Sequence, residues 1–189
     1  MKSKSLKVVL IILAIVAIII IYFVNINNSL VKRHEDVYQK KSEIQNMLQR
    51  RADLIPNLVD TIKGYTNYEG STLENIVLAR SGLTNAIQSG DVTEMANANN
   101  ELTKSINIVV EAYPDLKASQ NFIGLQDELA GTENRIATAR TYYNESVQEY
   151  NTYIKIFPQV FFSNMLGYES EKYFEANEEA TTVPKVNFN

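Results

Sequence analysis

The first clear feature in the pattern of apolar and polar residues is an uninterrupted apolar run, VVLIILAIVAIIIIYFV, at residues 8–24. Together with Leu6, this run is long enough to cross the hydrocarbon core of a bilayer as one helix. Tyr22 and Phe23 stand near one end, where interfacial aromatic residues are common. The run is longer than the apolar part of a typical secretory signal, and no small-residue cleavage site follows it. We therefore expect residues 1–28 to hold a short basic N-terminus and a retained single-pass anchor.

Beyond the anchor, apolar residues recur at spacings of three, four or seven, which indicates helix. This stripe predicts a helix that starts at about residue 28 and ends at Ser89-Gly90, with the buried positions Leu30, Val37, Ile44, Leu48, Ile55, Leu58, Ile62, Tyr65, Leu73, Ile76, Val77, Leu83 and Ile87. Pro56 lies on its path and removes one backbone donor. Because the apolar phase continues across Pro56, we expect a kink or a short break there, with Asp53 as a possible N-cap.

A second helix is expected to open at Asp91, which is followed by Glu94 at the spacing of a capping box. The residue before a proline avoids helical geometry, so this helix should end at Tyr113-Pro114. Its apolar face consists of Val92, Met95, Leu102, Ile106, Val109 and Tyr113.

The most regular pattern runs from Phe122 to Phe157, with spacings that alternate between three and four: Phe122, Leu125, Leu129, Thr132, Ile136, Ala139, Tyr143, Val147, Tyr150, Ile154 and Phe157. It predicts a helix of about 50 Å with coiled-coil-like packing. Short connections make neighbouring helices antiparallel. The expected fold class is all-α: a single N-terminal transmembrane helix followed by a long antiparallel three- to four-helix bundle over residues 29–158. Residues 159–189 should form a short docked helix and an extended or disordered tail.

Charge narrows the possible partners. Without the three lysines before the span, 15 basic and 22 acidic residues remain, a formal charge of −7, so we expect no nucleic-acid partner. Basic groups on the two flanks of the span are tied at four each, so the positive-inside rule gives no orientation. The chain has no cysteine, which excludes a lipoprotein thiol and fits a reducing or an oxidising compartment equally well.

Candidate chemistry is sparse. The only histidine is His34, and neither a cysteine nor a His-x-x-x-His pair is present to bind a metal. Asp127, Glu128 and Glu133 do not form the convergent carboxylate pair that a hydrolase needs. We therefore expect no enzyme, no catalytic residue, no cofactor and no metal site.

One polar pattern stands out in YNESVQEYN, where Tyr143-Asn144 recurs seven residues later as Tyr150-Asn151. The favoured interpretation is that the tyrosines fill the core while the asparagines, with Arg140 and Glu133, form an interhelical polar network that fixes register. Arg51 and Asn57 are the expected partners on the first helix. A ligand or partner site on the same face remains the alternative.

Three segments resemble the LemA family across nearly the whole chain: RRADLIPNLVDTIKGY (residues 50–65), EAYPDLKASQNF (residues 111–122) and LQDELAGTENRIATARTYYNESVQEYN (residues 125–151). Departures are Thr141-Tyr142, in place of a more usual Arg-Phe, and a tail that is only loosely similar. The resemblance implies a bacterial protein with an N-terminal membrane helix, a short N-terminus outside and a helical bundle in the cytoplasm. It does not imply an enzyme, and no catalytic residues carry over from it.

The leading hypothesis is a non-enzymatic, membrane-anchored interaction or scaffold module at the cell membrane, with a protein partner or a second copy bound to it. Its candidate structural or interaction residues are Arg51, Asp53, Pro56, Asn57, Glu133, Arg140, Tyr143, Asn144, Tyr150 and Asn151. The competing hypothesis is a small-ligand sensor or enzyme with a polar pocket between helices. A third is a rod lying on lipid headgroups through Lys32, Arg33, Lys40 and Lys41, against which the acidic remainder argues.

Overall fold

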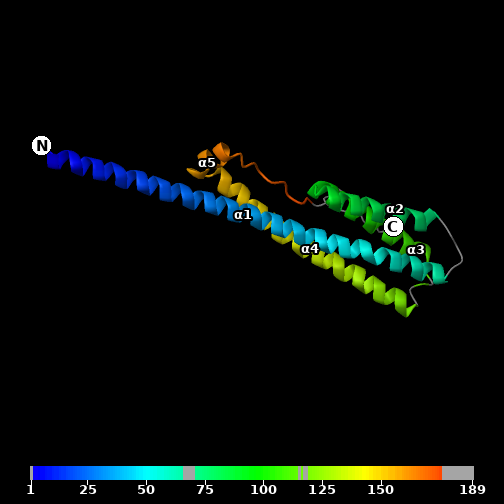
Figure 1. The fold of residues 1–189 in the computed structure, drawn as a ribbon. Coiled ribbons are helices and arrows are strands. Elements are labelled where there is room, and N and C mark those ends of the chain that lie inside the picture. Colours follow the sequence, from blue (N-terminus) through cyan, green and yellow to red (C-terminus); the bar gives the residue numbers. More distant parts are fainter. Residues whose placement is uncertain (1, 66–70, 115, 117–118, 176–189) are drawn as a thin grey trace, which may run out of the picture. The chain divides into compact units, whose positions relative to one another are not determined.

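The structure, a computed structural model, describes residues 2–65, 71–114, 116 and 119–175. In this part of the chain all regular structure is helical, as the predicted all-α class requires. The helices follow one another as α1 Lys2–Tyr65, α2 Ser71–Ser89, α3 Val92–Ala112, α4 Gln120–Lys155 and α5 Gln159–Leu166 (Figure 1).

Helix α1 is 64 residues long and passes from the apolar run into the bundle without ending. By length and composition it is the one helix in the described ranges that could cross a membrane, with a mean hydropathy of 3.2 over its most apolar stretch. The side chains of that stretch are exposed, as lipid-facing side chains are. These properties agree with the predicted N-terminal anchor.

Of the predicted kink or short break at Pro56, the break is wrong, because Pro56 lies inside α1. A proline leaves the carbonyl four residues earlier, here that of Ala52, without its helical donor. Arg80 of α2 replaces this donor: its Nε donates to the Ala52 carbonyl oxygen at 2.9 Å. The helix therefore continues through the proline with its backbone acceptor satisfied.

The predicted single helix from residue 28 to Ser89 is also wrong, since α1 ends at Tyr65 and α2 begins at Ser71. Helix α2 turns back along α1, because Gln45 Nε2 donates to the Ile87 carbonyl at 3.1 Å while Ala52 lies opposite Arg80. Apolar spacing cannot reveal such a reversal when both helices keep their apolar faces on one core.

Contacts divide the chain into two units. Unit 1 comprises Met1–Gln39 and Glu145–Glu171, and unit 2 comprises Lys40–Asn144 and Lys172–Asn189. The predicted domain boundaries after residues 28 and 158 stay predictions.

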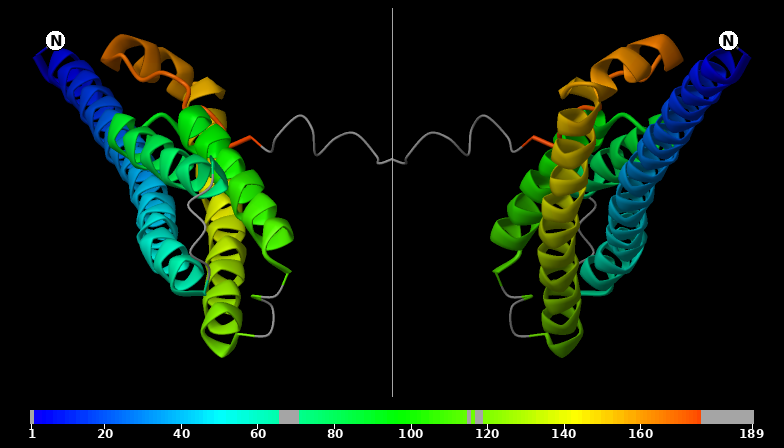
Figure 2. Two further views of the ribbon diagram at one scale, coloured as in Figure 1. Left: turned by 90° about the vertical axis from the view of Figure 1, so that its right-hand side faces the viewer. Right: turned by 90° about the vertical axis from the view of Figure 1, so that its left-hand side faces the viewer.

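Unit 2 contains the later part of α1, the α2–α3 hairpin and the first part of α4. Helices α2 and α3 lie side by side (Figure 2). Helices α1 and α4 run antiparallel, since Arg51 meets Glu133 and Lys40 lies over the ring of Tyr142. Most predicted core positions of this unit are buried, among them Ile44, Leu48, Ile55, Leu58, Leu83, Met95, Leu102, Phe122, Ile136 and Tyr143. Val77 is an exception, being 48% exposed.

Helix α3 begins at the predicted cap. Asp91 Oδ1 accepts from the backbone N–H groups of Thr93 and Glu94 at 2.8 and 3.1 Å. The reciprocal arm of the capping box runs through Ser89, whose hydroxyl donates to the Glu94 carboxylate and accepts from the Asp91 N–H. The helix ends at Ala112 with Tyr113 as its C-cap, which agrees with the predicted end.

Unit 1 contains the earlier part of α1, the end of α4 and all of α5. Val147, Tyr150 and Ile154 are buried as predicted, but Phe157 is 78% exposed because α4 ends at Lys155 and the helical phase ends with it. After Pro158 the expected short helix is α5. An extended segment follows it as far as Glu175, and the rest of the predicted tail, residues 176–189, lies outside the described residues.

Candidate functional site

The first Tyr-Asn pair of α4 binds the extended segment after α5, which we call the tail strap (residues 169–175). In unit 2, the Tyr143 hydroxyl donates to the Lys172 carbonyl at 2.8 Å. The Asn144 amide makes two hydrogen bonds with Phe174: its Nδ2 donates to the carbonyl at 3.0 Å, and its Oδ1 accepts from the N–H at 2.8 Å. A primary amide thus pairs with one residue of the strap as a neighbouring β-strand residue would.

The second pair makes the same contacts within unit 1. The Tyr150 hydroxyl donates to the Glu169 carbonyl at 2.9 Å. Asn151 Nδ2 donates to the Glu171 carbonyl, and Asn151 Oδ1 accepts from the Glu171 N–H, both at 2.8 Å. Burial raises the pKa of the Tyr150 phenol to about 12, with smaller contributions from Glu171 and two neighbouring tyrosines. The neutral phenol, which can donate, is therefore strongly favoured.

The two pairs have a common register. They recur after seven residues on α4, while the strap residues that the asparagines bind, Glu171 and Phe174, are three apart. Seven helical residues rise about 10.5 Å, and three extended residues span about 10 Å. The rise of seven helical residues is therefore close to the length of three extended residues, so each Tyr-Asn pair can reach a strap residue in the same way. All six of these hydrogen bonds join side chains of the two pairs to backbone groups of the strap.

The most buried side chain of the strap is that of Phe174, which is 2% exposed. The Arg140 guanidinium lies 4.7 Å from the centre of the Phe174 ring, a cation–π distance, and its Nη2 donates to the Glu175 carbonyl at 3.1 Å. Burial lowers the pKa of Arg140, and the charge of Glu133 partly opposes this shift. Arg140 thus holds the end of the strap.

Lys172 connects the strap to α3. Its Nζ lies 3.0 Å from Asp91 Oδ2, while Asp91 Oδ1 caps the helix. The hydrogen bond from Lys172, followed by those from the backbone of α3, holds the pKa of Asp91 at about 2. One carboxylate therefore both caps a helix and binds the strap.

A buried polar cluster joins three helices of unit 2. Arg51 of α1 is 3% exposed, and its Nη1 donates to Asn99 Oδ1 of α3 at 2.7 Å and to the Glu133 carboxylate of α4. Asn99 Nδ2 lies 3.5 Å from the same carboxylate. Burial lowers the pKa of Arg51, and the nearby charge of Glu133 opposes this effect. The cluster joins the three helices through Arg51 Nη1, while the buried Arg51 Nε has no hydrogen-bond partner among the described residues.

The remaining predicted residues lie apart from this cluster. Asp53, Pro56 and Asn57 are exposed. The Asp53 carboxylate accepts from Gln49 one turn earlier on α1, so it does not cap a new helix. Asn57 does not join Arg51, and Asn144 and Asn151 bind the strap instead of a neighbouring helix. Of the residues predicted to line a polar pocket, Glu133 lies beside Arg51 and its charge acts on Arg140, whereas Asn57 is exposed and Asn144 binds the strap.

Sequence reasoning missed four contributors. Asn99 stands at a core position of α3, four residues after Met95 and three before Leu102, and a polar residue there was a readable signal. Lys172 and Phe174 belong to a tail without periodicity, so their roles could not be read. Arg80 could have been sought as the donor that a mid-helix proline requires.

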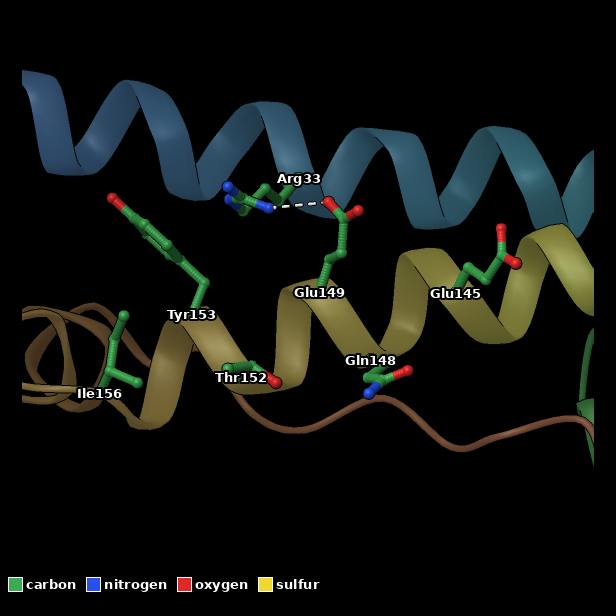
Figure 3. Close-up of a pocket in the computed structure, with 7 residues that line it drawn as sticks. All are labelled: Arg33, Glu145, Gln148, Glu149, Thr152, Tyr153 and Ile156. Atoms are coloured by element: carbon green, nitrogen blue, oxygen red, sulfur yellow. Dashed lines mark hydrogen bonds and ion pairs between the residues drawn. The ribbon is translucent and has the colours of Figure 1, made fainter.

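An open groove of about 610 Å³ lies along unit 1, lined by Arg33, Glu145, Gln148, Glu149, Thr152, Tyr153 and Ile156. Figure 3 shows Arg33 pointing toward Glu149, with Tyr153 beside it. Arg33 Nη1 and Glu149 Oε2 are 2.9 Å apart, and the guanidinium lies 4.9 Å from the Tyr153 ring centre. These side chains bind one another and do not converge on the groove. Among the described residues no cluster of three His, Cys, Asp or Glu could hold a metal.

Comparisons with known proteins give a consistent result. The model of the LemA family matches residues 40–188. Protein LemA of Metamycoplasma hominis is 28% identical over 170 residues, which cover 88% of this chain and 76% of that protein. Magnetosome protein MamQ 2 of Paramagnetospirillum magneticum is 25% identical, and magnetosome protein MamQ of Magnetospirillum gryphiswaldense 23%. Each of these two matches covers 78% of this chain and spans 64% of the relative's length.

Proposed function

Since the chain belongs to the LemA family, we propose that it is a non-enzymatic interaction module, held at the membrane by the apolar part of α1. One observation carries this proposal: polar side chains of the third family-like segment, residues 125–151, bind the chain's own tail strap. Asn144 and Asn151 each commit both hydrogen-bonding atoms of their amides to strap backbone. Arg140 holds the strap's end.

The pairing of these groups argues against the competing small-ligand or enzyme hypothesis. A ligand pocket needs a few polar groups that converge on a partly apolar volume. Arg51 is instead paired with Glu133 and Asn99, and Asn57 lies exposed on α1. Contacts within the chain hold these side chains in place, which favours a rigid bundle that another protein recognises.

Helix α1 supports attachment of this surface to a membrane. It is continuous from the apolar run to Tyr65, so a partner bound to the bundle is joined by unbroken helix to the anchor. The cytoplasmic location of the bundle is part of the proposal and comes from the family resemblance.

Photocrosslinking in intact membranes tests the proposal. A photoreactive residue replaces Tyr142, which is 51% exposed beside the Tyr-Asn pair, or the exposed Asn57. Leu78 on α2, 68% exposed, is the matched control because it lies outside the family-like segments. We expect a discrete crosslinked protein, heterologous or a second copy, from Tyr142 or Asn57 and not from Leu78. Absence of crosslinks from both sites, or equal labelling from all three, would contradict an interaction surface.

A further inference from the structure

Helix α5 lies within a largely apolar segment of the chain that has no charged side chain. Residues 156–168, IFPQVFFSNMLGY, contain no charged side chain. Five of their apolar side chains are exposed and define what we call the α5 patch: Ile156, Phe157, Phe161, Met165 and Leu166. Phe161 and Met165 are 65% and 66% exposed, which is unusual for such large side chains grouped within one short segment.

The place of α5 in unit 1 suggests what covers this patch. The Phe162 ring packs edge-on against the ring of Phe23, with the ring centres 5.3 Å apart. Phe23 is the penultimate residue of the apolar run of α1, and Ile26, one turn later, is the first fully buried side chain of the helix. Helix α5 therefore lies against α1 where the span leaves the hydrocarbon core.

The groups around the patch fit a membrane interface. Lys155 precedes the patch directly and is exposed, and the exposed Lys32 follows the span on α1, next to Arg33, which is paired with Glu149. Basic residues at this level attract anionic headgroups. Tyr153 and Tyr168 flank the segment and are half-buried, as the amphipathic rings of an interfacial aromatic belt are.

We propose that the α5 patch inserts into the interface of the same bilayer that α1 spans, as a second, monotopic membrane contact. This inference rests on the proposed membrane attachment. The tail strap begins directly after Gly167 and Tyr168, so the strap is joined at one end to a lipid-bound helix. Lipid, not a partner protein, is the occupant, because Phe162 of the same helix packs on Phe23 at the end of the span, and the exposed Lys155 and Lys32 stand in sequence next to the patch and after the span.

The absence of cysteine from the chain makes a fluorescence test direct. The full chain is reconstituted in vesicles of zwitterionic and anionic lipid, with an environment-sensitive label on Met165→Cys. Two further labelled variants are controls: Leu78→Cys on α2, with almost the same exposure, and Ile15→Cys within the span. Each label is quenched separately by nitroxide attached to shallow acyl positions and by aqueous iodide.

We expect the Met165→Cys label to be blue-shifted, quenched by nitroxide lipid and protected from iodide, while the Leu78→Cys label shows the reverse. Adding Phe157→Ser and Phe161→Ser should shift the Met165→Cys emission to the red and expose it to iodide. A Met165→Cys label quenched by iodide, or one shielded from both quenchers by protein, would overturn the proposal.

The Ile15→Cys label distinguishes a failure of α5 insertion from a failure of membrane attachment by α1. If it is quenched by lipid while the Met165→Cys label is not, the anchor stands and insertion of α5 fails. If neither label is quenched by lipid, the proposed membrane attachment itself fails.

Discussion

Arg80 donates from Nε to the carbonyl oxygen of Ala52, which is the backbone acceptor that Pro56 leaves without a helical partner. A buried carbonyl without a donor costs about 1–3 kcal/mol, so a mid-helix proline is tolerated best where another group supplies the bond. Both residues belong to unit 2, and Arg80 comes from the helix that turns back along α1. Arg80 therefore supplies the hydrogen bond that Pro56 removes from the helix.

A double-mutant cycle tests this pairing. Arg80→Met should lower the free energy of unfolding by about 1–2 kcal/mol in the native background, because the Ala52 carbonyl loses its donor. In the Pro56→Ala background the restored N–H at position 56 can bond that carbonyl, so the same change should cost less than half as much. Thermal unfolding of the full chain in detergent measures both values. Equal costs in the two backgrounds would refute the compensation.

The Arg51–Glu133 pair should respond asymmetrically to removal of each partner. Glu133→Ala leaves a buried guanidinium without its counter-charge, which we expect to cost about 3 kcal/mol. Arg51→Met leaves a carboxylate that is 39% exposed and can be hydrated, with an expected cost of about 1 kcal/mol. The thermal midpoint should fall roughly 6–12 °C for the first variant and less than half as far for the second. The opposite ranking would contradict a buried cation held by a surface carboxylate.

Sequence patterns predicted the helices and most of the core because both depend on local periodicity. The seam from Phe122 to Ile154 is buried throughout. The reversal between Tyr65 and Ser71 was not predicted, since a chain that folds back keeps the same apolar spacing. Phe157 was misassigned because its spacing fits a helix that ends at Lys155.

The site was predicted less completely than the core. Tyr143-Asn144 and Tyr150-Asn151 stood out by their heptad repeat, and the buried tyrosines follow from that pattern. What the asparagines bind did not follow, because their partners are backbone groups of an extended segment. Hydrogen bonds to backbone groups do not require particular side chains in the residues that are bound. Phe174 is the exception, because its ring is buried beside Arg140.

Lowering the pH should weaken the binding of the strap, because it protonates the Asp91 carboxylate that pairs with Lys172. The folded pKa of about 2 lies below the ordinary 3.8, so the folded state binds fewer protons, and this contribution to stability is present above pH 3.8 and lost toward pH 2. Lys172→Met removes its main cause. We expect the difference in thermal midpoint between native chain and variant to be largest near neutral pH and to vanish near pH 2. A difference independent of pH would contradict the ion pair.

Raising the pH should lower the stability of the protein, because it ionises the Tyr150 phenol that donates to the strap. Its pKa is raised from 10.0 to about 12, so the stability contributed by the neutral phenol is present below pH 10 and lost as the pH rises toward 12. The tyrosinate absorbance of the native chain, minus that of Tyr150→Phe, should titrate near pH 12. A difference spectrum that titrates near pH 10 would mean that this phenol is hydrated and does not donate to the strap.

Hydrogen exchange at two backbone amides most directly tests the claim that the Tyr-Asn pairs bind the tail strap. In the full chain, reconstituted in a lipid bilayer, the N–H groups of Glu171 and Phe174 should be protected. Asn144→Ala should deprotect Phe174, Asn151→Ala should deprotect Glu171, and the exposed Asn134→Ala on the same helix should change neither. Both amides exchanging at unprotected rates in the native chain, or both staying protected in Asn144→Ala and Asn151→Ala, would contradict the binding of the strap.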